Sequence, residues 1–377
     1  MNTGTSKAGT NWATLSIEAG PGISQAPLVD FEGRHFINLC AESFLCIGPE
    51  DPGLFNNRDN ITVANRLIKE MKPGCICATV QPDIGRALDS AINSLFHGKP
   101  CIILADNAIR SELMGLCAQK AEHLFTFNHL DNADLALRIK ELGKNDHESH
   151  NSRLLVITEA VFGGDGRIAE LTGLADTASA NGAAVVVDDT FGFGLLGPHG
   201  AGTIRHYSGY ENVAAEIGYA GGALGCNIAY TAFFEPGPAR QQDHDRADQA
   251  PADKHEAALL VSRLEKLSKD AEPIEQVWEA TRYLREGLNA FWFDTGDTHS
   301  PITPVVIGGL RESLDFAGRL LDMGIIVQVV RSPVLADNKY GLRLTVTAGH
   351  DEDQLETAIN AFIVVGRKMG MNLPPSR

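Results

Sequence analysis

The stretch 185–202 reads VVVDDTFGFGLLGPHGAG, and it decides the fold. Its three valines form an apolar run, which is typical of a strand buried on both faces of a parallel sheet. Asp188 ends this run, and parallel α/β sheets bind their ligands at the carboxyl ends of the strands. A strand-end aspartate also commonly caps the turn that follows it, so both interpretations stay open at this point.

Further apolar runs and helical patterns alternate along the same part of the chain. Residues 101–104 (CIIL) and 154–157 (LLVI) predict buried strands, and residues 88–96 and 171–181 predict helices. Gly182 directly follows the second of these helices, where a glycine commonly ends a helix. The alternation of strands and helices predicts an α/β domain with a mainly parallel sheet.

The C-terminal part of the chain has a different pattern. Strands are predicted at 304–307, 325–330 and 342–346, and helices at 314–321 and 355–365. The last of these strands alternates apolar and polar residues, as a half-exposed antiparallel strand does. This pattern predicts a smaller α+β domain.

We expect the chain to divide into three parts. Residues 1–50 form an N-terminal segment, residues 51–275 the large α/β domain and residues 276–377 the small C-terminal domain. Within the large domain, residues 234–255 are polar, contain proline and have no periodicity, which predicts a loop.

The composition argues against several classes of function. The 377 residues carry 32 Lys+Arg and 48 Asp+Glu, a formal net charge of −16 with no basic cluster, which disfavours nucleic acid or an anionic membrane as partner. No apolar run reaches the ~18 residues of a membrane span, and the N-terminus has no signal-peptide pattern.

Seven scattered cysteines indicate a reducing compartment, so we expect a cytoplasmic protein. Their spacing is not that of a zinc site, and we expect no metal.

Several blocks of sequence, all in the same order, resemble the α-oxoamine synthase family. Residues 188–202 are similar to its "DEAHSxGxLGxxGxG" block, with matching glycine spacing. Further similar blocks lie at 127–135, 158–166, 300–306, 324–328 and 342–350, and a looser one lies at 37–47. The resemblance covers roughly residues 30 to 370, apart from a weak stretch at 56–82.

The resemblance implies a fold and a cofactor. Members of this family are pyridoxal-phosphate (PLP) enzymes of the aspartate-aminotransferase fold, fold type I. They have a large domain with a mainly parallel, seven-stranded-type sheet and a smaller α+β C-terminal domain. They are acyltransferases that join an amino acid to an acyl-CoA and release carbon dioxide.

The resemblance also implies the site residues. Asp188 corresponds to the aspartate that pairs with the protonated pyridine nitrogen of PLP. The other cofactor-binding positions that it implies are Phe191, Gly163, Gly221 and Gly222. It implies Arg343 and Ser43 as substrate-binding residues.

The lysine that this chemistry requires is missing. PLP enzymes of this kind hold the cofactor as a Schiff base with a lysine, which the family carries in "SKAxGxxGG". Counting back from Gly221 and Gly222 places Ala215 at that position, so we expect no catalytic residue there. No lysine lies anywhere between Asp188 and Gly237.

Other family positions have changed as well. Phe191 replaces the histidine of "DEAH", and Gly163 replaces the serine of "VFSMDG". The strand and loop of the "D…NHAS" segment, whose histidine stacks on the cofactor ring, are expected to be deleted, with the chain running from a helix near Cys117 directly to His123. The phosphate anchors of the family are not recognisable in residues 246–251.

These losses predict an α-oxoamine synthase-like pseudoenzyme in which PLP is bound non-covalently or lost. The resemblance is greatest to the lysine-lacking, non-catalytic subunit of serine palmitoyltransferase, an enzyme of sphingoid-base and sphingolipid synthesis. We therefore expect a homodimer or a heterodimer with a lysine-bearing homologue. Two alternatives stay open: an active acyltransferase for acyl-CoA and an amino acid that uses a partner's lysine, and a small-molecule binding protein.

Overall fold

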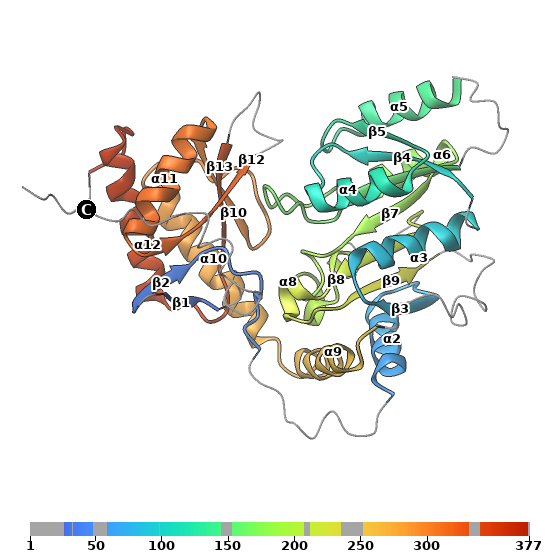
Figure 1. Ribbon diagram of the computed structural model, residues 1–377, viewed down its shortest axis with the longest axis horizontal. Coiled ribbons are helices and arrows are strands. Elements are labelled where there is room, and N and C mark those ends of the chain that lie inside the picture. The colour runs from blue at the N-terminus through green and yellow to red at the C-terminus, as the bar shows by residue number, and fades with distance from the viewer. Residues whose placement is uncertain are drawn as a thin grey trace, which may run out of the picture.

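The computed structural model describes residues 26–31, 33–47, 59–97, 99–144, 153–206, 212–234, 252–331 and 340–375. It has two main parts, a large sheet with its helices and a smaller helix-and-strand layer beside it (Figure 1). The expected loop at 234–255 lies outside the described residues except at its two ends, and residues 246–251 lie wholly outside them. No helix in the described ranges is both long and apolar enough to cross a membrane.

The large part is built on a seven-stranded sheet in the order β3-β9-β8-β7-β6-β4-β5. Only β9 runs antiparallel to its neighbours, and the other adjacent pairs are parallel. The predicted α/β class and mainly parallel sheet are therefore confirmed. The strands are β3 (Cys77–Gln81), β4 (Cys101–Asp106), β5 (His123–Phe127), β6 (Arg153–Glu159), β7 (Ala184–Asp188), β8 (Ala215–Tyr219) and β9 (Ala229–Phe233).

The order of the strands fixes where the sheet opens to a ligand. The chain passes from β3 through β4 to the edge strand β5, and then turns back through β6 to β7. Because crossovers between parallel strands are right-handed, the helices of the outward and the return path cover opposite faces. The two paths diverge between β4 and β6, and such a switch point leaves a crevice at the carboxyl ends of the strands.

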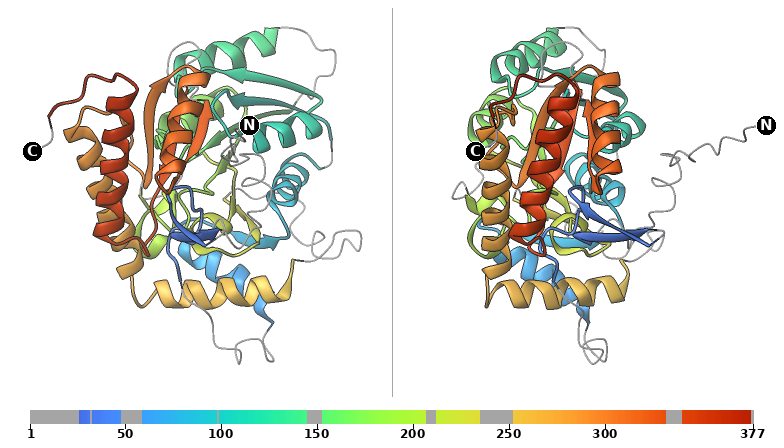
Figure 2. Two further views of the ribbon diagram at one scale, coloured as in Figure 1. Left: turned by 60° about the vertical axis from the view of Figure 1, so that its left-hand side comes forward. Right: turned by 90° about the vertical axis from the view of Figure 1, so that its left-hand side faces the viewer.

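The helices of this part follow from local sequence signals. On the outward path are α3 (Ile84–Phe96) and α4 (Ser111–Lys120), and on the return path α5 (Asn132–Lys144) and α6 (Leu171–Ala180). The predicted end of α6 is confirmed, because Gly182 has a φ of 74° and the next residue donates its N–H back to Ala178 O over 3.0 Å. Two more helices, α2 (Asn60–Met71) and α9 (Lys254–Leu267), pack against each other below the sheet (Figures 1 and 2).

Within the described residues, the smaller part contains two three-stranded sheets and three helices. One sheet has the order β10-β13-β12 and the other β1-β2-β11. The elements are β1 (Leu28–Phe31), β2 (Arg34–Asn38), α10 (Glu272–Ala290), β10 (Ile302–Gly308), α11 (Leu310–Asp322), β11 (Ile325–Ile326), β12 (Gln328–Arg331), β13 (Tyr340–Thr345) and α12 (Glu352–Lys368).

Two strand predictions in this part need correction. The run 325–330 is not one strand, because it is divided at Val327 between the two sheets. The strand at 342–346 is not half-exposed, and residues 341–345 of β13 are all buried. β13 lies between β10 and β12, and α11 contacts it. The hydroxyl of Thr345 donates to Ala41 O over 2.8 Å, so the N-terminal segment also covers this strand.

The division into domains stays a prediction. The boundary expected after residue 275 falls within α10, a continuous helix of 19 residues. Trp278, near the start of α10, donates its indole N–H to Leu195 O in the large part over 3.1 Å. Leu284 and Leu288, further along, belong to the core of the smaller part. One helix therefore connects the two cores.

A buried histidine connects three turns at the edge of the large sheet. His129 Nδ1 lies 3.0 Å from Asp106 Oδ1 at the end of β4, and His129 Nε2 lies 3.4 Å from Asp165 Oδ2. Burial lowers the pKa of His129, but the carboxylates of Asp106 and Asp165 more than offset this and raise it to about 9. The folded protein therefore holds His129 as an imidazolium between two carboxylates.

This arrangement predicts a loss of stability at alkaline pH. Since the folded pKa of His129 lies above the ordinary histidine pKa of 6.5, its contribution is complete below about pH 6.5 and is lost as the pH rises towards 9. We expect the free energy of unfolding, measured by chemical denaturation, to fall by on the order of 3 kcal/mol across this window. His129→Gln should be less stable at pH 6.5 and should lose that dependence. The same decline in the variant would contradict the assignment.

Candidate functional site

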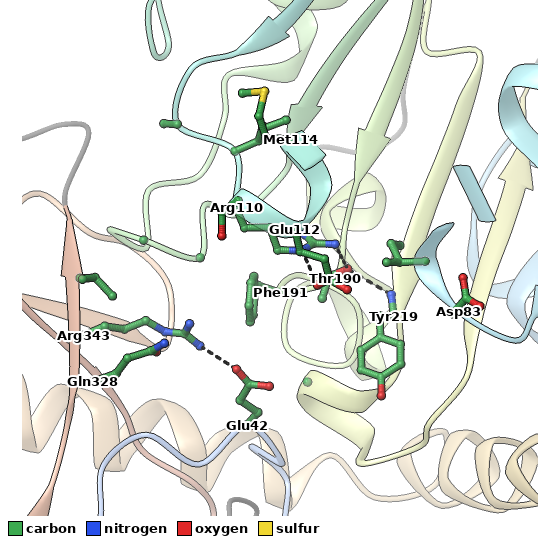
Figure 3. A pocket seen from close by; sticks show the side chains of 18 of the residues that line it. Glu42, Asp83, Arg110, Glu112, Met114, Thr190, Phe191, Tyr219, Gln328 and Arg343 are labelled. Carbon is green, nitrogen blue, oxygen red and sulfur yellow. Dashed lines mark hydrogen bonds and ion pairs between the residues drawn. The ribbon is translucent and has the colours of Figure 1, made fainter. Parts of the chain in front are cut away.

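A pocket of about 1030 Å³ opens at the carboxyl ends of the strands, between the large sheet and the β10-β13-β12 sheet (Figure 3). Loops that follow β4, β6 and β7 form one wall, and side chains from β12 and β13 form the opposite one. This is the crevice that the switch point predicts. Its polar and aromatic lining includes Glu42, Asp83, Asn107, Arg110, Glu112, Thr190, Phe191, Tyr219, Asn227, Gln328 and Arg343.

Arg110 lies among the lining residues of this pocket (Figure 3). Its guanidinium pairs with two buried carboxylates. Its Nη2 lies 2.5 Å from Asp188 Oδ2, and its Nη1 lies 3.2 Å from Glu159 Oε1. Its backbone N–H donates to the same Glu159 oxygen over 2.8 Å. Burial lowers the pKa of Arg110, but Asp188 and Glu159 more than reverse this effect. The guanidinium is therefore held in its charged form.

Asp188 occupies the position that the sequence predicted, at the carboxyl end of β7. Its side chain is 1% exposed, and its second oxygen accepts the backbone N–H of Thr190 over 2.9 Å. Glu159 ends the neighbouring strand β6 directly opposite Asp188. Burial raises the pKa of Glu159, and Arg110 offsets part of that rise. Both carboxylates are thus satisfied within the protein.

Phe191 and Gly163 meet in the pocket wall, and their identities depend on each other. Phe191 is 7% exposed. A Cβ atom added at Gly163 would lie 2.5 Å from Phe191 Cε2, closer than carbon atoms can approach. The two departures from the family pattern, phenylalanine for histidine and glycine for serine, are therefore one sterically linked change.

Arg343 reaches the pocket from β13 on the opposite wall. Its guanidinium carbon lies 5.1 Å from the centre of the Phe191 ring, and its Nη2 lies 3.7 Å from Glu42 Oε1. Burial lowers the pKa of Arg343, partly offset by Glu42, and its Nε has no hydrogen-bond partner among the described residues. Ser43, the other predicted substrate-binding residue, does not line the pocket, and its neighbour Glu42 does.

Ala215, predicted to take the place of the lysine, does not line the pocket. Ala215 is the first residue of β8, fully buried in the core of the large sheet and paired with Val186 and Phe233. It therefore lies at the amino end of its strand, whereas the pocket lies at the carboxyl ends. The chain reaches the pocket at Tyr219, the last residue of β8, and at Gly222 in the short helix α8 (Gly221–Leu224).

Of the two predicted glycines in α8, only Gly222 lines the pocket. A Cβ atom added at Gly222 would lie 3.4 Å from Thr190 O and 3.9 Å from the nearest Phe191 atom, so a side chain fits there. A Cβ atom at Gly221 would lie 2.0 Å from the ring of Tyr219, so a larger residue there would displace that ring.

The strand and loop that we expected to be deleted are present. β4 ends at Asp106, and residues 107–110 form a pocket loop before α4. Sequence reasoning therefore missed Arg110. The signal was available, because the argument that placed Asp188 at a strand end applies equally to the residues that follow the predicted strand at 101–104.

Lys72 is buried close to the site but does not reach the pocket. Its ammonium pairs with Glu216 and lies 3.8 Å from Asp189 Oδ2, and all three side chains are fully buried. Burial and the neighbouring Glu216 raise the pKa of Asp189, so two carboxylates share one ammonium. Asp189 follows Asp188 and bonds to Thr203 instead of the pocket residues, so this cluster lies away from the pocket.

The seven-stranded sheet, the pocket at its carboxyl edge and the α+β part that closes it define the fold of the PLP-dependent transferases, fold type I. The chain matches the aminotransferase class I and II family model over residues 114–362, and it belongs to that family. It is 28% identical to the 8-amino-7-oxononanoate synthase of Symbiobacterium thermophilum over 374 residues, with 92% of each protein covered.

Solved structures of the same fold agree with this placement. Serine palmitoyltransferase of Sphingomonas wittichii superposes with a TM-score of 0.78 at 19% identity, covering 96% of this chain and 97% of that one. A structure of SPT with a PLP internal aldimine has a TM-score of 0.78 at 20% identity, covering 95% and 96%. The 8-amino-7-oxononanoate synthases and serine palmitoyltransferase are both α-oxoamine synthases, so the resemblance found in the sequence is confirmed.

The residues of the pocket do not fit PLP. No described lining residue is a lysine that could bind its aldehyde. Asp188, which would pair with its ring nitrogen, already pairs with Arg110. A phosphate would be received at a helix N-terminus such as that of α3, which lines the pocket. There the carboxylate of Asp83 already accepts Arg86 N–H over 2.8 Å, and its negative charge opposes a phosphate.

The contact between Gly163 and Phe191 predicts a coupling between the two positions. Gly163→Ser should destabilise the wild type by about 1–3 kcal/mol, because its Cβ overlaps the Phe191 ring. The same change in a Phe191→His background should cost less, since a histidine ring is smaller. A double-mutant cycle by denaturant unfolding measures the difference. Gly115→Ser, where an added Cβ meets nothing within 4 Å, is the control and should give equal effects in both backgrounds.

Proposed function

We propose that this chain is a non-catalytic α-oxoamine synthase homologue that serves as a subunit beside a lysine-bearing homologue. One observation carries the proposal: the pocket has no described lysine, and the carboxylate that would hold the cofactor ring is held by Arg110. The fold around this pocket is nevertheless complete, with the large sheet, the α+β part and the connecting helix α10.

The position of the missing lysine belongs to the same proposal. Gly222 is the pocket residue that follows β8, and it has room for a side chain that would point towards Thr190 and Phe191. We place the lost lysine there. Glycine at this position removes the nucleophile without disturbing α8, which agrees with loss of chemistry and retention of the scaffold.

The partner is proposed from the relatives. A lysine-bearing α-oxoamine synthase, such as serine palmitoyltransferase or an 8-amino-7-oxononanoate synthase, has the same fold, which supports pairing of the two chains as homologous subunits. Such a partner would supply the acyl transfer between an amino acid and an acyl-CoA. This chain would have a structural role. Its Arg110 neutralises Asp188 and Glu159, so its fold does not need a bound cofactor to balance their charge.

The proposal predicts that the purified protein forms no aldimine. Incubation with PLP and reduction with borohydride should leave no stoichiometric label on any single lysine, because no described lysine reaches the pocket. Mass spectrometry after digestion measures the label, and a lysine-bearing α-oxoamine synthase treated in parallel is the positive control. One fully labelled lysine in this chain would show a working cofactor site and would favour the active-enzyme alternative.

Assembly gives the second prediction of this proposal. Interfaces of obligate partners bury on the order of 2,000–5,000 Å² in total, and complexes with interfaces of that size remain assembled during purification. We expect the chain to co-purify with a co-expressed lysine-bearing homologue as one species in size-exclusion chromatography with light scattering. Acyl-transfer activity should require the partner's lysine, and a partner with that lysine changed to alanine should still assemble. A chain that stays monomeric alone and after co-expression would leave only the binding-protein alternative.

A further inference from the structure

The end of β6 and the end of β7 place two carboxylates side by side. Glu159 and Asp188 are partners in the register of these parallel strands, and each is 1% exposed. Neighbouring strands lie about 4.8 Å apart, so two buried carboxylates at paired positions repel each other strongly unless a cation lies between them. The two paired carboxylates therefore require one positive charge between them.

Arg110 supplies this charge from the loop that follows a third strand, β4. Its forked guanidinium reaches Asp188 with one nitrogen and Glu159 with the other, at 2.5 and 3.2 Å, so each carboxylate has its own donor atom. Its Nη2 also lies 3.5 Å from Thr190 Oγ1, and its Nε lies 3.7 Å from Glu112 Oε2. Every nitrogen of the guanidinium thus faces a carboxylate oxygen.

We propose that Arg110 is the counter-ion of this pocket, occupying from within the protein the place at which Asp188 would receive a cationic ring, and that it thereby excludes such ligands. This inference deepens the proposed function and rests on it only for its biological meaning. A pyridinium that approached Asp188 would have to displace a guanidinium that two carboxylates and the backbone of residue 110 hold in place. The exclusion acts on the ring nitrogen and is independent of the missing lysine.

Removal of Arg110 should change which ligands the pocket accepts. Arg110→Ala leaves two buried carboxylates without a cation and leaves space for a guanidinium-sized ion. A small planar cation should enter that space and restore stability, whereas a cation that cannot bridge both carboxylates should do so less well. Pyridoxine, which has the ring but neither the phosphate nor the aldehyde, tests the ring site without contributions from Asp83 or a lysine.

The experiment compares the wild type, Arg110→Ala and Arg138→Ala. Arg138 is a half-exposed arginine of α5 that pairs with Asp134 over 3.4 Å and has no contact with the pocket, so it is the matched control. Thermal unfolding is measured with methylguanidinium chloride, and with methylammonium chloride at the same ionic strength. Pyridoxine binding is measured by equilibrium dialysis.

We expect Arg110→Ala to lower the unfolding midpoint by about 5 °C or more, and methylguanidinium, but not methylammonium, to restore most of that loss. The wild type and Arg138→Ala should respond to neither ion. Pyridoxine should bind Arg110→Ala at least ~10-fold more tightly than the wild type. An unchanged midpoint in Arg110→Ala, equal rescue by both ions, or equal pyridoxine binding by wild type and variant would overturn the inference.

Arg110→Lys covers the case in which Arg110→Ala does not fold. It keeps the charge but offers one donor nitrogen in place of two, so its midpoint should lie below that of the wild type, and an unchanged midpoint would overturn the role of the fork. These readouts use the chain alone and need no partner. Failure of the subunit proposal would appear in labelling or assembly, whereas failure of the Arg110 inference would appear in stability and pyridoxine binding.

Discussion

The arrangement of the site depends on the ion pairs of Arg110 with Asp188 and Glu159. The parallel register of β6 and β7 places the two carboxylates at the same height, and the loop after β4 brings the guanidinium to them. Glu159 also accepts the N–H of Gly163 over 3.0 Å, so the turn beside Phe191 is fixed by the same carboxylate. Thr190, bonded to Asp188, accepts the N–H of Tyr219 over 3.1 Å. One set of charges therefore connects the ends of four strands.

The fold was predictable where burial alone determines the element. The strands at 101–104, 154–157 and 183–187 are almost wholly apolar and lie in the middle of the sheet, where both faces are covered. The same reasoning failed at the edge. β5 has the pattern exposed, intermediate, exposed, exposed, buried, and no apolar run marks it. In β13 the alternation of Leu342, Arg343 and Leu344 suggested an exposed face, but Arg343 faces the pocket and not open solvent.

The site was only partly predictable, because its contacts join distant parts of the chain. Asp188, Phe191, Gly163, Gly222 and Arg343 could be found from a shared pattern, and the structure brings them to one pocket or to its edge. The partners of Arg110 are 49 and 78 residues away in sequence, which no local spacing can reveal. Ala215 lies away from the pocket for a related reason: strand pairing sets the register of β8, whereas counting from a glycine pair does not.

The contact between Gly163 and Phe191 also bears on the order in which these two substitutions arose. If an ancestor carried the family's serine and histidine, two changes separate it from the present protein. Phenylalanine arriving first would have met a serine Cβ at 2.5 Å, whereas glycine arriving first leaves a gap that a larger ring can then fill. The accessible route therefore passes through glycine. Once the phenylalanine is in place, a return to serine costs stability, so the change at Gly163 is harder to reverse than it was to make.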